Sequence, residues 1–214
     1  MSERELTPFD RLLIEADGML RTLSRGGASA SRPSPATGHS EPQLSERERQ
    51  HAAGLMRVNH TGEVCAQALY QGQALTAKTA GTRSEMQEAA QEEIDHLVWC
   101  EDRLEDLGAR PSALNPIFYG ASLAMGAVAG LIGDRVSLGF VHATEERVAS
   151  HLRDHLKALP DRDMKSQLIL QQMLEDEERH GENALKAGGQ ELPQQVKSVM
   201  TGVSKLMTQT TYWI

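Results

Sequence analysis

The sequence places ionisable residues where helical periodicity favours apolar ones. In "EEIDH", residues 92–96, Glu93 and His96 lie three positions apart on a predicted helix. Their neighbours on the same helical face are apolar, namely Met86, Ala89, Leu97, Cys100, Leu104 and Leu107. Burying a carboxylate and an imidazole in such a face costs free energy unless the two groups find partners there. The chain must therefore fold so that the core supplies a partner for both side chains.

The same pattern occurs on three further predicted helices. Glu63 lies on the apolar face of "RVNHTGEVCAQALY" and Glu145 on that of "LGFVHATEERVASHL". Glu177 and His180 share the apolar face of "LILQQMLEDEERHGENALKAG". Two faces thus carry a single glutamate, and two carry an E-x-x-H pair whose members point the same way.

The four predicted helices form two equivalent pairs. Glu63 and Glu93 are 30 residues apart, and Glu145 and Glu177 are 32 residues apart. In each pair a helix with one glutamate precedes a helix with E-x-x-H. This arrangement indicates a duplicated helical hairpin. It predicts an all-α protein, a four-helix bundle with four glutamates and two histidines converging in its core.

Such a cluster requires cations. Four buried carboxylates repel one another, and two divalent metal ions would cancel their charges. Oxygen and imidazole ligands suit iron or manganese better than zinc. The ligand set matches that of ferritin-like di-iron proteins, and it comprises Glu63, Glu93, His96, Glu145, Glu177 and His180. We predict a dinuclear metal site in which Glu93 and Glu177 bridge the ions, while Glu63 and Glu145 are terminal ligands.

Neighbouring ionisable residues receive different interpretations. One E-x-x-H in a Glu-rich helix is usually a solvated face, and only the duplication favours a metal site here. We expect the adjacent acids Glu92, Glu146 and Glu178 on solvated helix faces. His60 and His151 lie close enough to Glu63 and Glu145 along the chain to support the ligands without binding metal.

The rest of the chain indicates a short N-terminal region before the bundle. Residues 8–23 are predicted as an amphipathic helix, and the Gly-, Ser- and Pro-rich residues 25–44 as a flexible linker. Ser45 and Glu48 form a predicted capping box at the start of the first bundle helix. We therefore divide the chain into residues 1–44, an N-terminal helix and linker, and residues 45–214, the catalytic bundle.

The bundle helices have approximate predicted limits. The first runs to about residue 80, "AGT" at 80–82 makes a turn, and the second covers about 83–108. The second hairpin is expected over about 134–159 and 162–187. An amphipathic helix with Val196, Val199, Val203 and Leu206 on one face then ends the chain.

An uncharged segment separates the two hairpins. Residues 111–133, "PSALNPIFYGASLAMGAVAGLIG", carry no charged side chain. As a helix, residues 117–133 would be roughly 26 Å long, which is marginal for spanning a bilayer. The segment is either a buried crossover helix or a helix that meets the membrane interface and lines a passage for a lipidic substrate. Gly126 and Gly130 allow close approach of another helix or of a flat ring.

Composition excludes several classes of protein. The formal net charge of -8 argues against a nucleic-acid partner, since phosphates require a basic face. Two cysteines do not make a disulfide framework and favour a reducing compartment. Five acidic residues among the first 17 resemble neither a secretory signal nor a transit peptide.

Four motifs together resemble one family. "RVNHTGE", "EEIDH", "HATEERV" and "EDEERH", with the apolar insert between them, are similar to the demethoxyubiquinone hydroxylases over about residues 45–214. The resemblance implies the same six metal ligands and a di-iron centre that uses O2 to hydroxylate the ring of demethoxyubiquinol in ubiquinone biosynthesis. It also implies peripheral association with the cytoplasmic face of the bacterial inner membrane. His151 matches a histidine of that family, whereas Leu152 stands where some members have tyrosine.

The implied partners are a polyprenyl quinol and membrane lipid, with a homo-oligomer or other ubiquinone-biosynthesis proteins left open. No flavin or nicotinamide motif is present, so the reductant is NADH bound without a familiar motif, the quinol itself or a partner. Two other functions remain alternatives. A ferritin-like iron store would have no use for the apolar insert. A radical-generating subunit would need a tyrosine beside the metals, for which Tyr70 is the candidate.

Overall fold

The computed structural model describes residues 8–41 and 43–214, and within them it contains helices and no strand. The all-α prediction is confirmed. The helices are α1 (Pro8–Leu23), α2 (Glu46–Thr76), α3 (Ala80–Asp106), α4 (Asn115–Ile132), α5 (Asp134–Ala158), α6 (Met164–Lys186) and α7 (Gln194–Thr211).

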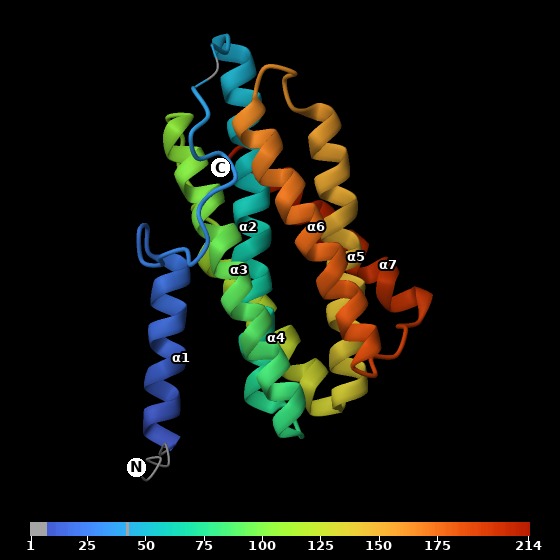
Figure 1. Cartoon of the computed structure of the whole chain (residues 1–214). Coiled ribbons are helices and arrows are strands. Elements are labelled where there is room, and N and C mark those ends of the chain that lie inside the picture. The colour runs from blue at the N-terminus through green and yellow to red at the C-terminus, as the bar shows by residue number, and fades with distance from the viewer. Residues whose placement is uncertain (1–7, 42) are drawn as a thin grey trace.

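Helices α2, α3, α5 and α6 run side by side as a bundle, and α1 lies beside it in contact with α2 (Figure 1). Helix α2 packs on α3, and α5 packs on α6, as the two predicted hairpins require. The hairpins close on each other through contacts of α3 with α6 and of α2 with α5. Fully buried apolar side chains fill the interior, among them Met56, Leu104, Leu152, Leu170 and Met173.

Helix α2 begins as the sequence predicted. The Ser45 hydroxyl accepts a hydrogen bond from the backbone N–H of Glu48, and the Glu48 carboxylate accepts one from the backbone N–H of Ser45. This reciprocal capping box satisfies two backbone donors that the first turn of a helix leaves unpaired.

The turn between α2 and α3 comes earlier than predicted. Helix α2 ends at Thr76, and residues 80–82, expected to form the turn, are the first residues of α3. The cause is a cap: the Thr79 hydroxyl accepts a hydrogen bond from the backbone N–H of Thr82 at 3.2 Å. Threonine at this position ends the connection after three residues.

We call residues 24–45 the N-terminal strap; its described residues, 24–41 and 43–45, have no helix, in agreement with their composition. They do not behave as a flexible linker, however, because ion pairs attach the strap to α3. Arg25 lies 3.1 Å from Glu105, and Glu41 lies 2.9 Å from the buried Arg103. Residues 1–7 and 42 lie outside the described residues, and the domain division at residue 44 stays a prediction.

Helix α4 touches the backbone of α2 through glycine. A Cβ atom on Gly126 would lie 2.1 Å from the carbonyl oxygen of Leu69, and one on Gly72 would lie 2.2 Å from that of Leu123. The other side of α4 is uncovered, since Ile117 and Leu131 are 69% and 66% exposed. The buried-crossover alternative therefore describes the side of α4 that packs on α2, and contact of the other side with a membrane stays a prediction. By length and apolar composition, α4 could cross a membrane.

We expect Gly126→Ala to lower the free energy of unfolding by about 1–3 kcal/mol, because its methyl group would push α4 away from α2. Gly120, in the same helix, is the matched control, since a Cβ there meets no atom within 4 Å. Gly120→Ala should instead stabilise the protein by about 0.5–1 kcal/mol. Urea unfolding of both variants measures the difference, and equal stability would contradict the close α2–α4 contact.

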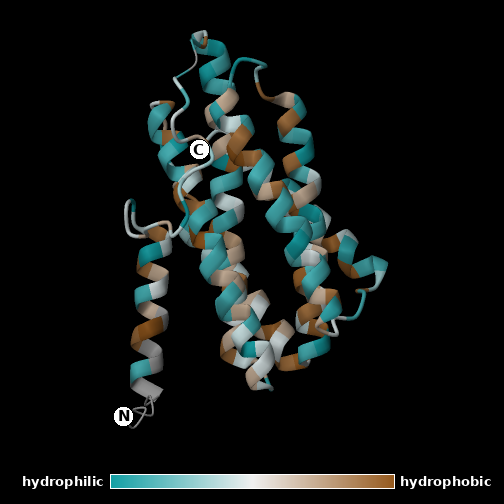
Figure 2. Cartoon of the chain, viewed as in Figure 1, coloured by the Kyte–Doolittle hydropathy of each residue, from teal (hydrophilic) through white to brown (hydrophobic). Residues whose placement is uncertain are grey.

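Helix α7 covers parts of α2 and α5 at the side of the bundle opposite α3 and α6. The Tyr212 hydroxyl, just beyond its end, lies 2.6 Å from Nδ1 of His51 in α2. Val199 and Leu206 of this helix are 66% and 62% exposed. Hydrophilic residues lie over much of α3 and α6 in Figure 2. Most of the large exposed apolar side chains lie on other helices, α4 and α7 among them.

Candidate metal centre

The four bundle helices bring all six predicted ligands into the core. None of the six is more than 7% exposed. They are Glu63 from α2, Glu93 and His96 from α3, Glu145 from α5, and Glu177 and His180 from α6. Helical spacing placed each of them on the buried face of its helix, as the sequence predicted.

His96 lies among three of the glutamates. Its Nδ1 atom is 2.9 Å from Glu93 Oε2, 3.2 Å from Glu177 Oε1 and 3.8 Å from Glu63 Oε2. Donor atoms of these four residues all lie within 4.8 Å of one another, a spacing at which they could share a metal ion. Three of the four bundle helices contribute to this group.

His180 approaches the same two central carboxylates from α6. Its Nδ1 atom is 3.0 Å from Glu93 Oε1 and 3.6 Å from Glu177 Oε2. The two imidazole rings are 6.5 Å apart. Glu93 and Glu177 thus each lie close to both histidines, which is the position that bridging carboxylates require. Their bridging role stays a prediction.

Several donor atoms in the cluster have no hydrogen-bond partner. Glu93 Oε1, Glu177 Oε2 and His180 Nδ1 are buried and unpaired, although they lie close together. Leaving buried polar atoms unpaired is costly. Ions coordinated by oxygen and imidazole nitrogen would occupy all three atoms, so the donor set fits a metal centre.

The electrostatics also show that this cluster cannot easily hold four negative charges. Burial raises the pKa of Glu63 and Glu145 well above the ordinary carboxyl value, and the charges of Glu93 and Glu177 raise it further. Burial would lower the pKa of His96 and His180, but the surrounding carboxylates raise both. Divalent cations would stabilise all four ionised carboxylates at once.

Each histidine is held by an acid from the opposite hairpin. His96 Nε2 lies 3.0 Å from Asp176 Oδ2, and His180 Nε2 contacts Glu92 Oε2. An acid on Nε2 leaves Nδ1 of each ring facing the cluster, and such partners orient metal-binding imidazoles. Glu92 is on a solvated face as predicted, with its side chain 49% exposed, but the sequence did not predict its contact with His180. Asp176 was missed; its signal is an acid directly before the glutamate of each E-x-x-H.

Tyr70 is a further buried residue of the site. Its hydroxyl donates a hydrogen bond to Glu145 Oε1. Burial and the charge of Glu145 raise the pKa of Tyr70 well above the ordinary phenol value. Tyr70 therefore remains a neutral donor that orients Glu145.

The other residues considered from sequence lie farther out. Glu146 and Glu178 are exposed and pair with Lys197 and Arg153, as a solvated face requires. His60 is buried between α2 and α4, with Nδ1 3.3 Å from Nδ2 of Asn115. His151 Nε2 lies 2.9 Å from the Ser204 hydroxyl of α7.

A cavity of 250 Å³ lies between α2, α4, α5 and α7 and has Glu63 in its wall. Most of its lining is apolar, including Ala66, Leu69, Phe118, Phe140, Val148 and Met200. Met125 of α4 and Val199 and Val203 of α7 also line it and are themselves 39–66% exposed. The cavity therefore connects the metal centre with the surface between α4 and α7.

Fold and site together define a ferritin-like helical bundle with a buried carboxylate–histidine cluster that could hold metal. A thioferritin from Bacteroides fragilis has the same fold, with a TM-score of 0.55 and 17% identity over 64% of this chain and 84% of that chain. The family model "Ubiquinone biosynthesis protein COQ7" matches residues 50–211. The chain belongs to this COQ7 family.

Curated relatives agree over the full length. Proteins named 3-demethoxyubiquinol 3-hydroxylase from Ectopseudomonas mendocina and Pseudomonas syringae pv. syringae are each 59% identical to the chain. The Pseudomonas aeruginosa PAO1 protein of the same name is 57% identical. Each alignment covers 100% of this chain and 99% of the relative.

Proposed function

We propose that the protein is a di-iron monooxygenase that uses O2 to hydroxylate the ring of demethoxyubiquinol in ubiquinone biosynthesis. The observation that carries the proposal is the apolar cavity that reaches from the surface to Glu63. The reaction is the one named for the full-length relatives. A lipidic ring needs such a passage to reach a metal centre in the middle of a helical bundle.

Iron suits the donor set better than zinc, because four carboxylates and two imidazoles favour a higher coordination number than a closed tetrahedron. When bound, two iron ions would supply the reduction of O2. The six ligands would hold the ions, with Asp176 and Glu92 fixing the histidine rings and Tyr70 fixing Glu145. These contacts would fix the orientation of the ligands before the substrate binds.

The cavity would bind and orient the quinol ring beside Glu63. Its apolar walls exclude water from the reacting ring, which protects the oxidant from being wasted. The polyprenyl tail would leave between α4 and α7, where Met125, Val199 and Val203 are both cavity-lining and exposed.

Contact with lipid follows from the same surface. The uncovered side of α4 and the outer side of α7 present exposed apolar residues beside the mouth of the cavity. A peripheral position on the cytoplasmic face of the bacterial inner membrane would let the tail remain in lipid while the ring enters. The reductant, NADH, the quinol or a partner protein, and any homo-oligomer or partner protein of ubiquinone biosynthesis stay open within this proposal.

The alternative is a ferritin-like iron-binding or storage protein, which the shared fold permits. A passage lined by apolar side chains does not serve the transport of hydrated iron. The decisive experiment supplies the iron-loaded protein with a short-tailed demethoxyubiquinol, a reductant and ¹⁸O2. We expect a quinol product that contains one ¹⁸O atom; the same reaction in H2¹⁸O with unlabelled O2 is the control. Accumulation of iron far beyond two ions per chain without product would support storage.

A further inference from the structure

The two histidines of the metal centre have unequal outer surroundings. Asp176, which holds His96, is fully buried, whereas the side chain of Glu92, which holds His180, is 49% exposed. A buried carboxylate keeps one position against its imidazole, while an exposed one exchanges readily with water. The reason that Asp176 can be buried with its charge lies in the N-terminal strap.

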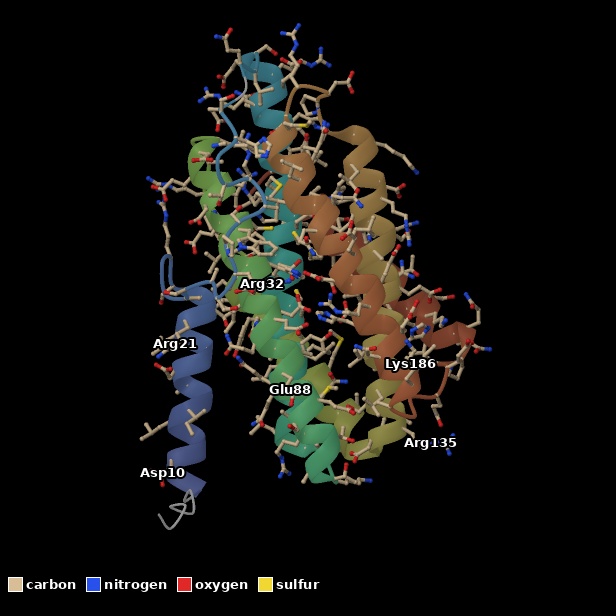
Figure 3. All side chains as sticks on the ribbon, viewed as in Figure 1. Asp10, Arg21, Arg32, Glu88, Arg135 and Lys186 are labelled. Atoms are coloured by element: carbon tan, nitrogen blue, oxygen red, sulfur yellow. The ribbon has the colours of Figure 1, made fainter. Side chains whose placement is uncertain are left out.

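Arg32 of the strap pairs with two buried acids at once. Its Nε atom lies 2.6 Å from Asp95 Oδ2, and its Nη1 atom lies 2.9 Å from Asp176 Oδ2. The guanidinium lies over the ring of Trp99, 4.9 Å from its centroid. In Figure 3, Arg32 lies where the strap crosses α3, well away from the ends of the bundle.

The backbone of the strap is held at the same place. The backbone N–H of Ser31 donates to Asp95 Oδ1 at 2.6 Å, and Trp99 Nε1 donates to the carbonyl oxygen of Arg32 at 3.4 Å. The guanidinium is a planar group with several donors, so it can bind the two carboxylates in a defined geometry. A continuous set of contacts thus runs from Arg32 through Asp176 to His96.

The other nearby arginine, Arg179, cannot account for the difference between the surroundings of His96 and those of His180. Arg179 lies 2.8 Å from Asp176 Oδ1 and 3.4 Å from Glu92 Oε2, so it contacts both outer acids. Arg32, by contrast, forms an ion pair with Asp176, the outer acid of His96. The strap therefore adds a cation to the His96 half of the centre.

We propose that Arg32 is a positioning residue of the metal centre, which holds Asp176 against His96 so that the ion beside His96 binds more tightly than the ion beside His180. The inference rests on the dinuclear site proposed above. It makes the strap, and not only the bundle, part of the metal centre.

The test is a Co²⁺ titration of the full-length chain after its metal has been removed by a chelator, followed by visible absorption and calorimetry. Wild-type protein should bind two ions in two separate steps. Because Arg32 acts through Asp176, Arg32→Gln should weaken the tighter step by up to the roughly 10–100-fold effect of losing an outer partner of a ligand, and it should leave the weaker step unchanged. Arg32→Lys should fall between the two, because an ammonium group keeps the charge but cannot match the planar fork.

Two variants separate this role from general stability. Arg25→Gln removes the strap's ion pair with Glu105 and should leave both steps unchanged. Glu92→Gln should weaken the second step and spare the first. Equal weakening of both steps by Arg32→Gln, or the same loss in Arg25→Gln, would overturn the proposal, as would two equal steps in the wild type. Fewer than two ions in the wild type would instead contradict the dinuclear site, and because no quinol is present the result is independent of hydroxylation.

Discussion

Glu177→Ala is expected to remove most of the bound iron and abolish hydroxylation, with the bundle still folded. Glu177 lies 3.2 Å from His96 Nδ1 and 3.6 Å from His180 Nδ1, and one of its oxygens is buried without a hydrogen-bond partner. A ligand that bridges two ions would hold both of them. Its removal should therefore lower metal affinity by more than the roughly 10–100-fold decrease caused by losing an outer partner. Folding should survive because the change also removes one of four mutually repelling buried charges. Iron per chain, helical content and product formation are the measurements.

The adjacent residue gives a matched control. Glu178 is about half exposed and pairs with Arg153 on the surface, where an ion pair contributes little. Glu178→Ala should keep full iron content and activity. Glu177→Gln, which keeps the volume but not the charge, should lose iron as Glu177→Ala does. Full iron and full turnover in either Glu177 variant would contradict the ligand assignment.

The centre of the site could be predicted because it depends on the spacing of residues within single helices. A carboxylate in an apolar helical face is costly, so its recurrence at four corresponding positions identified Glu63, Glu93, Glu145 and Glu177. The two histidines followed from E-x-x-H, since residues three apart share a helical face. Helix periodicity also fixes which side of each helix is buried, and two similar hairpins have few ways to close.

The surroundings of the site depend on contacts between distant segments and could not be predicted. Arg32 and Asp176 are 144 positions apart, and nothing local to either predicts the ion pair. The Gly, Ser and Pro content of the strap correctly indicated the absence of helix, but composition does not reveal attachment to α3. Likewise, Glu92 has the sequence context of a solvated acid, and only the position of α6 brings His180 to it.

Helix α4 shows how far an apolar pattern can be interpreted. Gly126 and Gly130 indicated a close contact, and the structure places α2 against them. The same pattern says nothing about the opposite side of the helix, because burial in protein and contact with lipid select the same residues. The structure separates the two sides: Leu123 packs near Val64 and Leu97, whereas Leu131 is 66% exposed.

Leu131→Glu is therefore expected to lower partitioning into anionic-lipid liposomes by about a hundredfold. A charged side chain at the level of the hydrocarbon costs roughly 2.5–3.5 kcal/mol, and each 1.4 kcal/mol corresponds to about a factor of ten. Iron content should stay at the wild-type level, because Leu131 lies on the uncovered side of α4, away from the bundle core. Turnover of a long-tailed quinol should fall with membrane binding, while turnover of a short-tailed quinol in detergent should be retained.

Leu123→Glu, on the packed side of the same helix, provides the contrast. Its carboxylate would be placed against the buried cluster of Val64, Ala68, Leu97 and Tyr119. We expect lower thermal stability and loss of iron, because Val64 and Leu97 directly follow Glu63 and His96 in the chain. Co-sedimentation with liposomes and iron analysis on the same preparations distinguish the two sides. If Leu131→Glu binds liposomes like the wild type, α4 does not face lipid, and the tail must leave the cavity along α7 alone.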